Sequence, residues 1–245
     1  MEKSRCISQE LLKLIACVTM LTDHIGAVFF PDTLWLRIIG RIAFPIYCFL
    51  LAEGMRHTRN PVKYLLRLML GILLAELPFD YLFFGRFTWE HQSVMVTLTW
   101  GAFMLLCMQK LPNRLLKILL AVAFALIAEA SMCDYGGYGI LLIAIFGLRT
   151  KWQYQLPLVL ALGLVKDAQY VVDALQYFPN RPTADAISYI LRVSPPIQSL
   201  SFLAMAPISL YSGRKQTRSK TLQTTFYLFY PVHLTLLWII ANFLL

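Results

Sequence analysis

Residues 9–30 read QELLKLIACVTMLTDHIGAVFF, and this stretch decides the class of the fold. It is apolar over a length that crosses about 30 Å of hydrocarbon at about 1.5 Å per residue. No small-residue cleavage site follows it, and Asp23 and His24 interrupt the apolar run, so we interpret it as a retained membrane span and not as a removed signal peptide.

Similar apolar runs recur to the last residue. Hydrophobic residues make up 58% of the 245 positions and charged residues 14%, and the mean hydropathy is +0.63. A soluble domain of this size needs more polar surface. We therefore predict an all-α, polytopic integral membrane bundle that forms one domain over residues 1–245. The predicted spans are nine, with eight to ten as the range: 9–30, 34–53, 63–84, 93–109, 114–132, 137–149, 153–176, 197–212 and 222–243. The sixth and eighth are short, which predicts that they are tilted, broken or re-entrant.

The basic residues give an orientation. The chain has 22 Lys and Arg against 13 Asp and Glu, a net charge of +9. Fourteen of the basic residues fall on one side of the predicted spans: Lys3, Arg5, Arg56, Arg59, Lys63, Lys110, Arg114, Lys117, Arg149, Lys151, Arg214, Lys215, Arg218 and Lys220. Four fall on the other side: Arg37, Arg86, Arg181 and Arg192. This asymmetry predicts that the N-terminus is cytoplasmic and that the protein lies in the cell's inner membrane. It also explains the positive net charge, so we do not expect nucleic acid as a partner.

Ionisable residues lie inside the apolar runs, where each costs about 2.5–3.5 kcal/mol at a helix centre. They are Asp23, His24, Arg41, Arg67, Glu76, Asp80, Glu129, Asp167 and His233. With the orientation above, most of them fall in the outer half of the bilayer. A cluster of both signs at one depth predicts a water-accessible polar chamber that opens toward the outside.

His24 is the candidate for chemistry, because imidazole alone has an ordinary pKa suited to proton transfer near neutrality. Asp23 and His24 project about 100° apart on a helix, so each needs a partner on another helix. We predict Arg41 as the partner of Asp23, and we group His24, Asp23 and Arg41 as catalytic. The alternative is a buried histidine that ties two helices together through hydrogen bonds.

A second group of cations lies at the predicted cytoplasmic end. Arg56, His57, Arg59, Lys63 and Arg67 are close in sequence, where a phosphate-bearing donor can dock. Orientation in the membrane alone also explains these residues.

Acceptor recognition is assigned to polar residues that border the chamber. Glu76 and Asp80 are four residues apart and share a helix face, so one of the two carboxyl groups has a raised pKa unless a cation such as Arg41 or Arg67 lies between them. Asp134 and Tyr135 precede a run of glycines at an outer turn. The complete set of predicted substrate-binding residues is Glu53, Glu76, Asp80, Asp134, Tyr135 and His233.

Several short stretches together resemble one family, the TraX family. They are Thr22–Gly26, Gly40–Pro45, Glu53–Gly54, His57–Asn60, Tyr64–Arg67, Pro78–Asp80, Asp134–Gly136 and Phe229–Leu234. They occur in order along nearly the whole chain. The resemblance implies acetyl transfer, since the family's namesake acetylates the amino terminus of a pilin subunit. It also implies a relation to membrane acyltransferases that carry acyl groups from cytoplasmic acyl-CoA to acceptors across the membrane.

The sequence therefore predicts an integral membrane acetyltransferase that uses acetyl-CoA and an extracytoplasmic amine or hydroxyl acceptor. We expect lipid around the bundle and no metal, because no zinc-ligand spacing, zinc-protease motif or phosphate-binding loop occurs. Two rival functions remain open. One is a proton-coupled transporter, in which buried carboxylates and histidines relay protons. The other is a non-catalytic membrane assembly factor.

Overall fold

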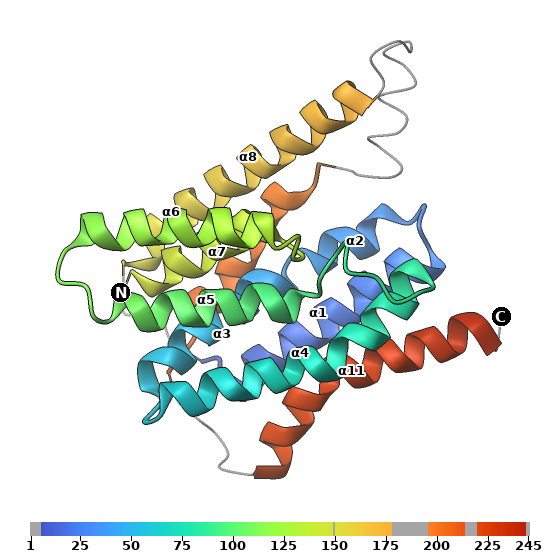
Figure 1. The fold of residues 1–245 in the computed structure, drawn as a ribbon, viewed down its shortest axis with the longest axis horizontal. Helices are drawn as coiled ribbons and strands as arrows, with labels where there is room; N and C mark the ends of the chain where they lie inside the picture. Colours follow the sequence, from blue (N-terminus) through green and yellow to red (C-terminus); the bar gives the residue numbers. More distant parts are fainter. Residues whose placement is uncertain (1–5, 149, 178–195, 214–219, 244–245) are drawn as a thin grey trace.

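The structure, a computed structural model, describes residues 6–148, 150–177, 196–213 and 220–243. Within these ranges the chain is helical, and its β contacts are two isolated bridges, Ile7 with Tyr211 and Gln92 with Cys133. The predicted all-α class is confirmed, and the helices pack side by side in one bundle (Figure 1). They are α1 (Gln9–Phe29), α2 (Leu34–Gly40), α3 (Ala43–His57), α4 (Pro61–Phe84), α5 (Val94–Met108), α6 (Arg114–Ala130), α7 (Gly136–Gly147), α8 (Trp152–Tyr177), the 3-10 helix η1 (Gln198–Ala204), α10 (Met205–Ser209) and α11 (Lys220–Phe243).

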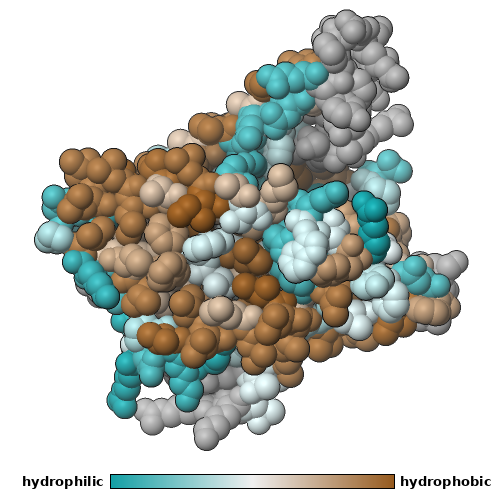
Figure 2. Space-filling view, in the orientation of Figure 1, coloured by the Kyte–Doolittle hydropathy of each residue, from teal (hydrophilic) through white to brown (hydrophobic). Residues whose placement is uncertain are grey.

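The described helices include three candidate membrane spans, judged by length and hydropathy: Gln9–Phe29, Leu34–His57 and Thr224–Phe243. Helices α5 and α7 are apolar but shorter. The surface also suits a membrane. Helix α4 turns Leu66, Leu70 and Leu73 outward, and Leu73 is 75% exposed. Figure 2 shows hydrophobic residues over most of the visible face, an arrangement that water does not favour.

Side-chain caps begin three of the helices. Ser8 Oγ accepts from the Leu11 amide at 3.2 Å, and Asn113 Oδ1 accepts from the Leu116 amide at 2.8 Å. Ser and Asn are among the residue types that most often cap the start of a helix. Asn60 Oδ1 also accepts from the Lys63 amide at 2.9 Å. Pro61 follows at the first helical position, so α4 begins two residues before the predicted start.

The predicted continuous span 34–53 is wrong in one respect, because the helix breaks between Gly40 and Ala43. The reason lies in Pro45. A proline nitrogen cannot donate to the carbonyl four residues earlier, which is that of Arg41, and the ring clashes with it. In the first turn of α3 the same proline is tolerated. The break leaves α2 free to cross α1.

The predicted span 197–212 is not a regular α-helix, in agreement with the expectation that this short span is tilted, broken or re-entrant. It begins as the 3-10 helix η1 and continues as the short α10, which ends at Ser209. Asp167 of α8 holds the start of η1, because its carboxylate accepts from the amides of Gln198 at 2.6 Å and Ser199 at 2.9 Å. A buried carboxylate thus satisfies backbone donors that an ordinary α-helix leaves free.

Helix α7 lies at the centre of the bundle. Ile140, Leu142 and Ile143 are fully buried, and Phe146 is nearly so. A helix that is apolar all round and buried in this way needs contacts on every side. It packs against α3, α5, α6 and α8. The positive φ of Gly136 begins the helix beside the Glu129 carboxylate, which accepts from the Gly137 amide at 2.6 Å.

Glu76 and Asp80, which were predicted to bind substrate, accept hydrogen bonds from the loop that follows α4. The Glu76 carboxylate accepts from Ser93 through Oγ at 2.8 Å and through the amide at 3.2 Å. Asp80 Oδ2 accepts from the Thr88 amide at 3.0 Å. Neither residue forms an ion pair in the described part of the chain, and neither lines the large cavity described below. Both carboxylates hold the loop 85–93 to α4.

The basic residues used for orientation are only partly described. Lys110, Arg114 and Lys117 lie at the same end as the α3–α4 turn, in agreement with the predicted loop order. Lys3, Arg5, Arg149, Arg181, Arg192, Arg214, Lys215 and Arg218 lie outside the described residues. The bridge of Ile7 with Tyr211 closes that same end of the bundle.

Replacing Glu76 by Ala tests the loop anchor. Ser93 is fully buried, so its amide and hydroxyl lose their acceptor, and we expect a loss of about 1–3 kcal/mol in the free energy of unfolding. Thermal unfolding in detergent measures it. Glu90→Ala, at an exposed position in the same loop, is the control and should unfold like the wild type. Equal stability of Glu76→Ala and Glu90→Ala would remove Glu76 as an anchor.

Candidate functional site

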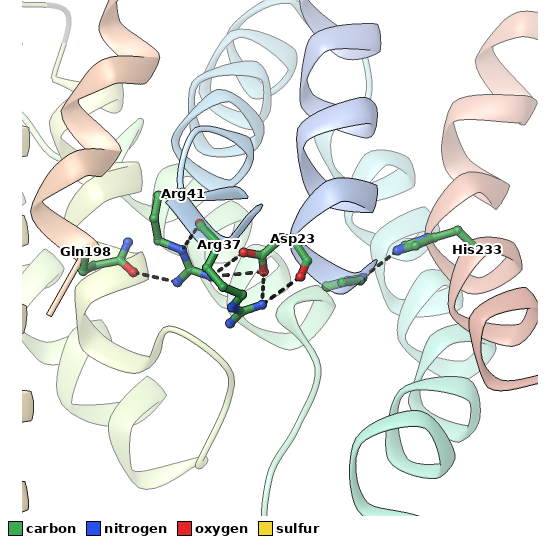
Figure 3. Close-up of polar contacts among 6 residues, drawn as sticks. Asp23, Arg37, Arg41, Gln198 and His233 are labelled. Carbon is green, nitrogen blue, oxygen red and sulfur yellow. Dashed lines mark hydrogen bonds and ion pairs between the residues drawn. The ribbon is translucent and has the colours of Figure 1, made fainter. Parts of the chain in front are cut away.

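The buried Asp23 carboxylate is held by two arginines (Figure 3). Arg37 Nη1 donates to Oδ2 at 2.8 Å, and Arg41 Nη2 donates to Oδ1 at 2.8 Å and to Oδ2 at 3.0 Å. Asp23 is 7% exposed. The predicted partner Arg41 is thus in place. Arg37 is a second partner that the sequence analysis left in an outer loop.

Two glycines bring α2 close enough to α1 for these ion pairs. A Cβ on Gly26 would lie 2.7 Å from Cβ of Leu36. A Cβ on Gly40 would overlap the carboxylate of Asp23 itself. Arg37 and Arg41 are one turn apart on the same side of α2, so both guanidinium groups reach one carboxylate.

A polar chain continues from Arg41 into the other half of the bundle. Arg41 Nη1 donates to Gln198 Oε1 at 3.0 Å, and Gln198 Nε2 donates to the Tyr138 hydroxyl at 3.1 Å. That hydroxyl lies 3.0 Å from Ser201 Oγ. All four groups are buried or nearly so. Figure 3 shows the part of this row of contacts that runs from Gln198 through Arg41 to Asp23. Because Tyr138 lies on α7 and Asp167 of α8 fixes the start of η1, the same contacts join α7, α8 and η1 to the Asp23 cluster.

His24 faces away from Asp23 toward α11. Its Nδ1 lies 2.8 Å from Nε2 of His233, and Nδ1 of His233 lies 2.7 Å from the carbonyl oxygen of Phe229. The carbonyl can only accept, so His233 carries its proton on Nδ1. Nε2 of neutral His233 is then an acceptor, and His24 donates from Nδ1. These two hydrogen bonds favour the tautomer of neutral His24 that has its proton on Nδ1 and its lone pair on Nε2. A general base needs such an available lone pair.

A cavity of about 980 Å³ runs past this site. At one end it is lined by Lys13, Glu53, His57 and Arg67, and at the other by Arg37, His91, Asp134 and Tyr135. His24 lies between these ends. On α1 the lining residues Lys13, Cys17, Met20 and His24 follow one face of the helix.

The predicted site residues divide into two groups. Those that line the cavity are Asp23, His24, Arg41, Glu53, His57, Arg67, Asp134 and Tyr135. Those that do not are Arg56, Arg59, Lys63, Glu76, Asp80 and His233. Arg56 instead forms an ion pair with Glu53 and donates to the Phe146 carbonyl at 3.3 Å. His233 contributes through His24.

The far end of the cavity is shaped by an unusual backbone. Tyr135 has φ +65°, and its ring stacks on Phe44 with centroids 3.7 Å apart. Thr97 Oγ1 donates to the carbonyl of Asp134. The Asp134 carboxylate lies 3.9 Å from Nε2 of His91. These contacts fix a carboxylate and an imidazole at the rim.

Several functional residues were missed or undervalued in the sequence. Arg37 was placed in a loop, although its spacing from Arg41 was a signal. Asp167 was noted as buried but given no role. Gln198 carried no signal in the sequence. Tyr138 lies in the glycine-rich stretch after Asp134 and Lys13 lies inside an apolar run, but only tertiary packing brings them to the cluster and to the cavity.

The rim histidine gives a pH prediction. The Asp134 carboxylate raises the pKa of His91 above its ordinary value, and partial burial opposes this effect. The stabilising charge pair is therefore complete below pH about 6.5 and is lost as the pH rises through the raised pKa. We expect the melting temperature to lose a small step, worth less than about 1 kcal/mol, over that pH range. His91→Gln should abolish the step in pH-dependent thermal unfolding; a step that persists in this variant would contradict the assignment.

Comparison with known proteins gives the family. The family model described as TraX protein matches residues 8–241. The probable fimbrial assembly protein FimC, serogroup H1, of Dichelobacter nodosus is 32% identical over 244 residues, which cover 92% of each chain. The uncharacterized protein RP591 of Rickettsia prowazekii (strain Madrid E) is 51% identical over 41 residues, which cover 17% of this chain and 16% of its own. No solved structure matches. The chain belongs to the TraX family.

Proposed function

We propose that this protein is an integral membrane acetyltransferase. It moves an acetyl group from cytoplasmic acetyl-CoA to an amine or hydroxyl of an acceptor at the outer side of the membrane. The observation that carries the proposal is the cavity of about 980 Å³, which has lining residues at both ends of the bundle and His24 between them. Donor and acceptor can thus reach one base from opposite sides.

The proposed topology has nine passes in the inner membrane, with α2 and α3 forming one broken pass and η1 and α10 another. Support comes from the three long apolar helices, the apolar outer surface of α4 and the basic residues around the α3–α4 and α5–α6 turns. The N-terminus is then cytoplasmic. The Lys13–Arg67 end of the cavity faces the donor, and the His91–Asp134 end faces the acceptor.

The proposed reaction uses the lone pair on Nε2 of His24. Nε2 takes a proton from the acceptor as the acceptor nitrogen or oxygen attacks the thioester carbonyl carbon. The tetrahedral intermediate then collapses, the carbon–sulfur bond breaks, and the leaving thiolate takes the proton back from His24. The hydrogen bond to His233 can shorten and strengthen while His24 carries positive charge.

Arg41 serves to position the site in this mechanism. Its Nη2, Nη1 and Nε groups already donate to Asp23, Gln198 and the Arg37 carbonyl. A cavity-lining tyrosine is therefore the better donor to the oxyanion of the intermediate. Tyr230 qualifies, since its ring centroid lies 6.4 Å from that of His24 and the residue lines the cavity.

A non-catalytic assembly factor is the second candidate, and the name of the Dichelobacter relative favours it. In that function the protein assists assembly of fimbriae, and the buried cluster only stabilises the bundle. The two candidates differ in one respect that can be measured. An assembly factor keeps its cellular function when the base at position 24 is removed but the fold is kept.

His24→Gln tests the proposed base. Gln keeps a hydrogen-bond donor for His233 but supplies no proton acceptor of suitable pKa, so we expect acetyl transfer to fall by about 10²–10⁴-fold. The assay follows free thiol released from acetyl-CoA by the protein in liposomes, with a panel of small amines and alcohols as acceptors. Asp32→Asn, at an exposed turn, is the control. Full activity of a folded His24→Gln protein would exclude His24 as the base. The absence of acetyl transfer by the folded wild type would instead favour the assembly factor.

His233→Ala tests the hydrogen bond that orients His24. Without His233 the Nδ1 proton of His24 loses its acceptor and the other tautomer becomes accessible, so we expect a loss of about 10–100-fold in kcat with little change in KM. His233→Gln can accept through its side-chain oxygen and should recover part of the rate. The comparison is made by steady-state kinetics at several pH values. Equal rates for the wild type and His233→Ala would show that the hydrogen bond from His24 to His233 does not contribute to the reaction.

A further inference from the structure

The geometry points to a site for the phosphates of the donor's nucleotide on Lys13 and Arg67, and not on the Arg56–Arg59–Lys63 group. This inference rests on the proposed function, because it places one end of the proposed donor. It also assigns Lys13, which lies inside an apolar run in the sequence, to ligand binding.

Two neighbouring rings of α11 position the cations. Lys13 Nζ lies 5.3 Å from the ring centroid of Phe226. The Arg67 guanidinium lies 5.8 Å from the ring centroid of Tyr227 and 5.3 Å from that of Tyr64. Cations over aromatic faces are restrained without losing their charge. Helices α1 and α4 thus present two positive groups on either side of α11.

The cavity includes this pair and excludes Arg56, Arg59 and Lys63. Lys13, Arg67, Tyr64, Phe226 and Tyr227 all line it. Arg59 and Lys63 are exposed and do not, and Arg56 is occupied by Glu53 and the Phe146 carbonyl. Only cations that face the cavity can hold phosphates while the rest of the donor extends into the bundle.

The aromatic residues suit the remainder of a nucleotide. Tyr64 is pressed against α3, since a Cβ on Gly54 would lie 2.8 Å from its hydroxyl. A tyrosine held in this way offers a rigid ring edge and face beside the Arg67 guanidinium. Purine bases stack on such rings and on the planar guanidinium groups of arginines, while phosphates bind to the positively charged side chains.

One of the two acidic residues at this end of the cavity already pairs with a cation. Glu10 and Glu53 also line the cavity. The Glu53 carboxylate, however, forms an ion pair with Arg56, and its other oxygen lies 3.7 Å from His57 Nε2. The charge of Glu53 is therefore compensated by Arg56, which does not line the cavity.

The spacing along α1 agrees with a donor held at this end. Lys13 and His24 are 11 positions apart on one helix face, which corresponds to about 16 Å of helix. Cys17 and Met20 line the cavity between them. An extended pantetheine arm can cover this distance, so phosphates on Lys13 and Arg67 place the thioester near Nε2 of His24.

The test is calorimetric titration of CoA, and of pantetheine as the probe that lacks the nucleotide, into the purified full chain in detergent. We expect Lys13→Gln/Arg67→Gln to weaken CoA binding by about 10–100-fold, as loss of charge-assisted hydrogen bonds does, and to leave pantetheine binding unchanged. The matched control Arg59→Gln/Lys63→Gln removes two cations from the same end and should bind CoA within about twofold of wild type. Lys13→Arg/Arg67→Lys keeps both charges and should retain most of the affinity, which separates loss of charge from loss of folding.

The outcomes separate this inference from the proposed function. If the wild type binds CoA and the Lys13/Arg67 double variant binds it equally well, or if the Arg59/Lys63 variant loses binding instead, the assignment of the phosphate site is wrong and the donor stands. If the folded wild type binds neither CoA nor acetyl-CoA, the acetyltransferase proposal fails and this site fails with it.

Discussion

The structure depends on one costly feature, a carboxylate buried in an apolar bundle. Asp23 is stable there only because two guanidinium groups saturate it. To place both arginines on Asp23, α2 must pack closely against α1, and this close packing requires glycine at positions 26 and 40. It also requires the break between α2 and α3 that precedes Pro45. Arg41 in turn holds Gln198, so the irregular segment η1 is attached to the same cluster. Geometry at His24, the next residue along α1, follows from this arrangement.

The two neighbours Asp23 and His24 divide the work between different helices. Asp23 is directed toward α2 and stabilises the position of α1. His24 is directed toward α11, where Phe229 and His233 fix its tautomer. In the proposed reaction a rigid ion cluster therefore supports a base whose own hydrogen bonds remain available for change. Asp23 and His24 project about 100° apart on α1. The contacts of one side chain can therefore change without changing the contacts of the other.

Much of this could be predicted from the sequence, and the failures have physical causes. Hydropathy located the helices within a few residues, and Ser8 and Asn113, which cap the starts of α1 and α6, are residue types that cap chemistry favours there. The pairing of Asp23 with Arg41 followed from the cost of an unpaired charge. The partner of Glu76 could not be predicted in this way, because a carboxylate inside an apolar helix can also accept hydrogen bonds from a neighbouring loop, as Glu76 does from Ser93. Lys13 and Gln198 became visible only through packing, since neither forms a local pattern with its neighbours in sequence.

A cavity that reaches both ends of a membrane bundle carries a danger unrelated to acyl transfer. Protons and metal ions are driven through any continuous polar path by the membrane potential. Beside His24, however, two arginines face a single carboxylate, so the path passes a zone of excess positive charge in a medium of low dielectric constant. Fixed arginines of this kind exclude cations from water-filled pores. In the proposed topology, the two arginines on Asp23 therefore also disfavour the passage of cations along the cavity.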